Sequence, residues 1–65
     1  MFERTAPVHL LTDWSARLDA ITRAYDEGDA PYGERLFTQA LDDGVPWDQT
    51  CAAVARGIAR HYQSA

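Results

Sequence analysis

Lysine is absent from this 65-residue chain. Its six basic residues are all arginines, they stand against ten acidic residues, and the formal net charge is −4. Nonspecific nucleic-acid binding depends on basic side chains that replace the counterions of phosphate groups. The balance therefore argues against a nonspecific nucleic-acid binder. Arginine without lysine, together with 11 alanines, fits a high-GC bacterial or phage coding sequence.

Cysteine and long apolar runs are also scarce. The single cysteine, Cys51, excludes an internal disulfide, so the fold needs no oxidising compartment. No apolar run approaches the ~20 residues of a membrane-spanning helix. The N-terminus lacks the basic, apolar and small-residue order of a signal peptide. We therefore expect a cytoplasmic protein with no membrane association.

Catalytic and metal-binding motifs are missing as well. The sequence has no CxxC or HxxxH spacing and no glycine-rich phosphate loop. Cys51 falls on the apolar face of a predicted helix, and His9 and His61 lie near opposite ends of the chain. The acidic run from Asp26 to Asp29 lacks the alternating oxygen ligands and distal glutamate of a calcium-binding EF-hand loop. We expect no enzyme, metal, cofactor or small-molecule substrate.

The length predicts one domain, residues 1–65, with a single small core close to the lower limit for independent folding. Residues 1–11 contain a proline and show little periodicity, which predicts an N-terminal arm. The first helix is predicted over residues 12–26. Its apolar residues follow the three- and four-residue spacing of one helical face, at Trp14, Leu18, Ile21 and Tyr25.

A second helix is predicted over residues 31–43. It opens at Pro31, which lacks the amide hydrogen that a first turn leaves unpaired, and Asp29 is placed to cap it. Gly44 is expected to end it in the left-handed conformation, with Val45 folding back onto Ala40.

A third helix is predicted over residues 46–62. Its large apolar residues recur every three or four positions and predict a core face, namely Trp47, Cys51, Val54, Ile58 and Tyr62. Gly57 in mid-helix predicts close packing against the first helix. The outer face is predicted to carry Gln49, Ala53, Arg56, Arg60 and Gln63. The fold class is therefore all-α, a compact three-helix bundle.

The corner between the second and third helices resembles the turn of helix-turn-helix DNA-binding domains, on the spacing of Ala40, Gly44 and Val45. The resemblance implies that the third helix enters the major groove, where Gln49, Arg56, Arg60 and Gln63 would contact bases and phosphates. Residues 45–65 hold two arginines and His61 against one acid. The alternative is that the two arginines only solvate the outer face and complement the helix dipole.

Acidic turns and excess aromatic residues favour a protein partner instead. The acids either solvate their turns or dock on a basic partner, and aromatic residues near segment ends are expected to be exposed anchors. The candidate partner-binding residues are Phe2, Tyr32, Tyr62, Asp26, Glu27, Asp29, Asp42 and Asp43. The leading hypothesis is a non-enzymatic interaction or regulatory module, acting as a homodimer or as a small subunit or inhibitor of a larger protein. The alternative is a helix-turn-helix transcriptional regulator that uses the third helix.

Overall fold

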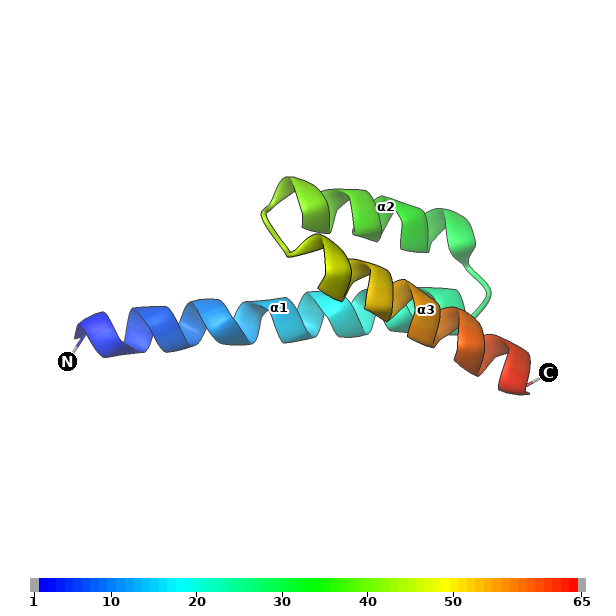
Figure 1. Ribbon diagram of the computed structural model, residues 1–65, viewed down its shortest axis with the longest axis horizontal. Helices are drawn as coiled ribbons and strands as arrows, with labels where there is room; N and C mark the ends of the chain where they lie inside the picture. The colour runs from blue at the N-terminus through cyan, green and yellow to red at the C-terminus, as the bar shows by residue number, and fades with distance from the viewer. Residues whose placement is uncertain (1, 65) are drawn as a thin grey trace.

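Three α-helices follow one another in a computed structural model of the chain: α1 (Phe2–Asp26), α2 (Ala30–Asp42) and α3 (Trp47–Ser64). The structure describes the backbone of residues 2–64 and the side chains of residues 14–64. All three helices pack together, and α3 lies along the C-terminal half of α1 while α2 lies over both (Figure 1). The predicted all-α three-helix bundle is confirmed.

The first helix begins ten residues earlier than predicted. The arm expected over residues 1–11 is wrong for residues 2–11, which form the first turns of α1. A helix shows periodic apolar residues where one of its faces is buried against another helix. The N-terminal half of α1 extends beyond α2 and α3 (Figure 1), so this half has no neighbouring helix to impose such a pattern. The bounds of α2 and α3 differ from the predicted ones by one or two residues.

The predicted caps at both ends of α2 are confirmed. The Asp29 carboxylate accepts a hydrogen bond from the backbone amide of Tyr32 at 3.3 Å and thereby caps the helix. At the other end, Gly44 has a φ of +98°. The Val45 amide donates to the Ala40 carbonyl at 2.9 Å, so the chain leaves α2 through a Schellman motif that turns it toward α3.

The core is made largely of small residues. Its buried hydrophobic members are Ile21, Ala24, Ala40, Val45 and Ala53. Larger side chains pack around this centre and are only partly buried, namely Trp14, Leu18, Tyr25, Leu36 and Val54. The hydroxyl of buried Thr22 donates to the Ala53 carbonyl at 3.0 Å and ties α1 to α3.

Close packing of α3 on α1, predicted from Gly57, is confirmed. A Cβ atom at Gly57 would lie 2.5 Å from the Thr22 carbonyl oxygen and 2.7 Å from the Tyr25 Cβ atom. A Cβ atom at Gly33 of α2 would lie 2.5 Å from the ring of the same tyrosine. Glycines on both neighbouring helices therefore make room for Tyr25.

The predicted core face of α3 is wrong for Trp47, Ile58 and Tyr62, whereas Cys51 and Val54 are partly buried and Val54 packs against the core. The buried residues of this helix are Thr50, Ala53 and Gly57, whereas Trp47 and Tyr62 are 64% and 74% exposed. Ile58 is also exposed. Ala53, which was expected on the outer face, is fully buried. Small residues let the backbones of α1 and α3 approach closely, and this contact rotates the larger apolar side chains away from the core.

Candidate functional site

The exposed side of α3 carries a broad apolar surface. Six exposed residues form it, and we call them the α3 apolar face: Trp47, Ala52, Ala55, Ile58, Ala59 and Tyr62. Helical spacing of three to four residues places them on adjoining rows of one side of the helix. Contiguous exposed apolar surface is a common mark of a protein-interaction site.

A shallow apolar groove adjoins this face between α2 and α3. Its volume is about 240 Å³, and it is lined by Tyr25, Glu34, Phe37, Cys51 and Val54. The ring of Trp47 meets Phe37 edge to face, with 5.6 Å between ring centroids. Trp47 therefore links the α3 apolar face to α2.

Acidic residues are nearly absent from α3, where Asp48 is the only one. The acids proposed as a docking surface lie at the two ends of α2: Asp26, Glu27 and Asp29 at one end, Asp42 and Asp43 at the other. A 13-residue helix is ~20 Å long, so the two groups do not form one cluster. Asp29 caps α2, and the Asp43 carboxylate pairs with the Arg17 guanidinium.

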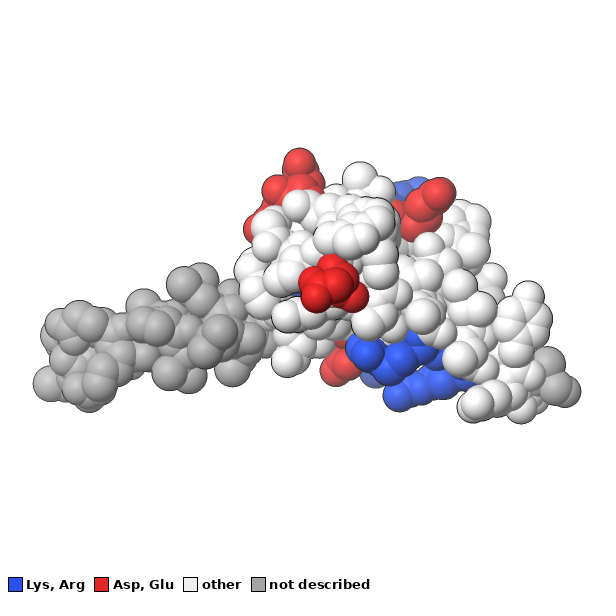
Figure 2. All heavy atoms as spheres, in the orientation of Figure 1, with Lys and Arg blue, Asp and Glu red and all other residues white. Residues whose placement is uncertain are grey.

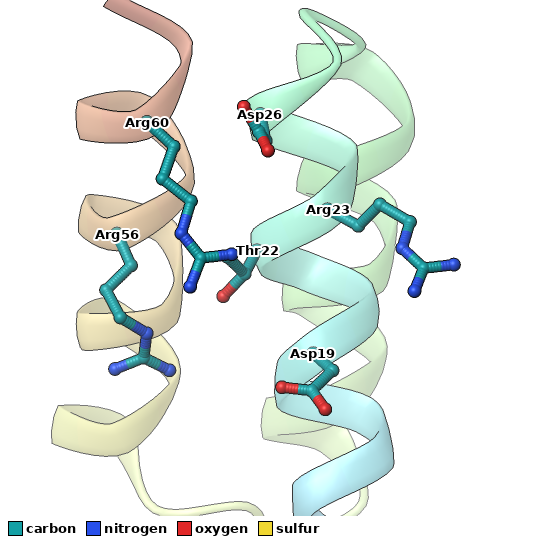
Figure 3. Close-up of a pocket in the computed structure, with 6 residues that line it drawn as sticks. All are labelled: Asp19, Thr22, Arg23, Asp26, Arg56 and Arg60. Carbon is teal, nitrogen blue, oxygen red and sulfur yellow. The ribbon is translucent and has the colours of Figure 1, made fainter. Parts of the chain in front are cut away.

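The arginines of α3 line a different groove, between α1 and α3. It has a volume of about 290 Å³ and is lined by Asp19, Thr22, Arg23, Asp26, Arg56 and Arg60. Arg60 reaches toward Thr22, whereas Arg23 turns away from α3 (Figure 3). Figure 2 shows a blue patch of arginine side chains near α3 with a red acidic side chain at its edge, and a smaller blue area beside a red one near the upper edge of the molecule. Asp19 and Asp26 line the opposite wall and weaken the positive potential that the arginines create.

The other residues predicted to bind a partner or DNA are spread over all three helices. Tyr32 is exposed, as predicted, and Tyr62, Gln49 and Gln63 are exposed on α3. The side chain of Phe2 lies outside the described residues. The Nδ1 atom of His61 lies 3.0 Å from the Asp26 carbonyl oxygen, a hydrogen bond that joins the C-terminal turn of α1 to α3.

Sequence reasoning missed Trp47, Ile58 and the alanines as surface residues. The signal was present, because Ala52, Ala55 and Ala59 extend the apolar character of α3 well beyond a single face. A helix with more apolar surface than one core contact can bury leaves part of it exposed.

Residues 14–64 bring together no cluster of histidine, cysteine and acidic side chains able to hold a metal ion. Within the described part of the chain, no helix has both the length and the apolar character that crossing a bilayer requires. Comparison with known proteins found no matching family model, curated protein or solved structure.

Proposed function

We propose that this chain is a non-enzymatic protein-interaction module and that the α3 apolar face is its binding surface. The observation that carries the proposal is the exposure of Trp47 and Tyr62, at 64% and 74%, on the same side of one helix. Tryptophan and tyrosine bury large areas at a small cost in conformational entropy and dominate many binding interfaces. The three exposed alanines between them let a partner approach the helix closely.

A regulatory role, as a small subunit or an inhibitor of a larger protein, is compatible with this surface and needs no cofactor or substrate. We place this role in the cytoplasm, in keeping with a chain that holds a single cysteine and no disulfide. The arginine-rich, lysine-free composition supports a bacterial or phage origin.

The competing proposal is a DNA-binding regulator that uses α3. The observation that favours it is the exposure of Arg56 and Arg60 on the helix that follows the Ala40–Gly44–Val45 corner. The acids Asp19 and Asp26 share the groove with both arginines and would repel phosphate groups. This electrostatic balance makes DNA binding the weaker proposal.

Two double variants separate these proposals. The first, Trp47→Ser with Tyr62→Ser, removes the aromatic anchors, and the second, Arg56→Gln with Arg60→Gln, removes the basic pair. Both change exposed side chains, so both variants should keep their helical circular dichroism. The arginine variant is the matched control for a protein partner, and the aromatic variant is the control for DNA.

Photo-crosslinking from Gln63, at the edge of the face, in cells that express the chain would report a protein partner, and titration of a random duplex at low salt would report DNA. We expect specific crosslinks, to another protein or to a second copy, that the aromatic variant loses and the arginine variant keeps. Crosslinks insensitive to the aromatic change, or a duplex complex lost with the arginines, would contradict the proposal.

A further inference from the structure

We infer that the partner of the α3 apolar face is a second copy of this chain, with the two α3 helices packed antiparallel about a twofold axis at Ala55. The inference rests on the proposed function, because it names the partner of the same surface. Three further features of α3 support it: the spacing of its exposed residues, its charge and the exposed area.

The exposed residues of α3 follow the spacing of a helix–helix seam. Steps of four, three, four and three residues connect Asp48, Ala52, Ala55, Ala59 and Tyr62, and all five side chains are exposed. This alternation keeps one row of side chains facing a partner helix along its whole length. Alanines in the middle of the row allow the two backbones to come close.

Antiparallel packing about Ala55 sets small residues against larger ones. In that register Ala52 lies opposite Ile58 of the second copy, and Ala59 lies opposite its Cys51. Asp48 lies opposite Tyr62 of the second copy, whose hydroxyl group can donate a hydrogen bond to the carboxylate. Each contact occurs twice because the axis relates the two helices.

The distribution of acidic residues favours contact through the α3 apolar face, with the two α3 helices antiparallel. Each copy has a net charge of −4, so two copies repel each other unless they meet where acids are few. Asp48 is the only acid of α3. Parallel packing would bring the two Asp48 carboxylates together, whereas antiparallel packing about Ala55 separates them by ~20 Å along the helix axis. It also opposes the two helix dipoles.

The exposed area is that of a weak dimer. A buried tryptophan or tyrosine covers roughly 150–250 Å², and the exposure of Trp47 and Tyr62 therefore leaves aromatic surface on the order of 300 Å² uncovered. Trp47 lies outside the row from Asp48 to Tyr62, so Tyr62, Ile58 and the alanines of two copies would bury about 800 Å² in total, the area of a weak, transient contact. We expect a dissociation constant in the micromolar range. A twofold contact uses the same surface on both copies, so assembly stops at the dimer.

Sedimentation velocity over a range of concentrations tests the inference. The wild-type chain should pass from monomer to dimer as its concentration rises. Ala55→Arg places two like charges at the axis and should raise the dissociation constant about tenfold or more. The matched control, Gln49→Arg, adds the same charge to an exposed position of α3 away from the seam and should dimerise like the wild type.

Disulfide trapping tests the register. In a Cys51→Ala background, Ala55→Cys should form a covalent dimer under mild oxidation, because the axis brings the two Cβ atoms within disulfide reach. Gln49→Cys in the same background should stay monomeric. Equal trapping of both variants would overturn the register.

The outcomes separate this inference from the proposed function. A wild-type chain that remains monomeric up to millimolar concentration, while Ala55→Arg loses crosslinks to a different protein, would overturn the homodimer and leave the interaction function standing. A monomeric chain in which neither Ala55→Arg nor the aromatic variant changes any crosslink would overturn both. A dimer equally stable in Ala55→Arg and Gln49→Arg would overturn the assignment to α3.

Discussion

Gly57→Ala is the substitution that most directly tests the packing of α3 on α1. Alanine stabilises an exposed helix interior by about 1 kcal/mol relative to glycine. At this position the added methyl group would lie 2.5 Å from the Thr22 carbonyl oxygen, whereas carbon–oxygen contacts normally measure about 3.3 Å. The two helices must therefore separate by roughly 0.8 Å.

Moving α3 away from α1 by this distance should lower the free energy of unfolding. Overpacking of this kind typically costs 1–3 kcal/mol, and the Thr22–Ala53 hydrogen bond, 3.0 Å long, would lengthen at the same contact. Taking the upper part of that range and subtracting the propensity gain, we expect a net loss of about 2 kcal/mol. For a domain of this size that corresponds to a fall in Tm of roughly 8–16 °C.

Thermal and urea unfolding, followed by circular dichroism at one protein concentration, measure this loss. The control is Ala16→Gly at an exposed position of α1, which should lower the free energy of unfolding by about 1 kcal/mol through helix propensity alone. If Gly57→Ala were as stable as the wild type or more stable, while the control behaved as expected, the close α1–α3 contact would be refuted.

Three further substitutions test local features, each read from urea unfolding. Thr22→Val removes the buried hydrogen bond to Ala53 and should cost about 1 kcal/mol, whereas Thr22→Ser should cost less; equal losses would show that the hydroxyl group is unimportant. Gly44→Ala meets no neighbouring atom, so its expected cost of about 1–2 kcal/mol measures left-handed backbone strain alone, and a neutral result would contradict the turn. Asp29→Ala removes the cap of α2 and should cost about 1 kcal/mol, while Asp29→Asn should retain most of the stability.

Most of the fold could be predicted from the sequence, because the ends of the helices depend on residues that are close together in the chain. Asp29 and Pro31 mark the start of α2, and Gly44 with Val45 marks its end, because caps and turns depend on a few neighbouring residues. The amphipathic spacing in α1 correctly placed Ile21 in the core and Trp14 against it. Exposure of Tyr32 was also predicted correctly, from its position near a helix end, whereas Tyr62 was expected both as an exposed anchor and on the core face and is exposed.

Tertiary structure alone decided which side of α3 is buried. Apolar residues occupy several sides of this helix, so periodicity identified a helix and could not choose its core face. The choice depends on how closely the backbone of α1 at Thr22 approaches Gly57, a contact between residues distant in sequence. The same contact exposes Trp47 and places Arg56 in a groove shared with acids of α1. Apolar spacing indicated that the molecule is helical and composition that it is acidic, and long-range packing determined which of its surfaces is exposed.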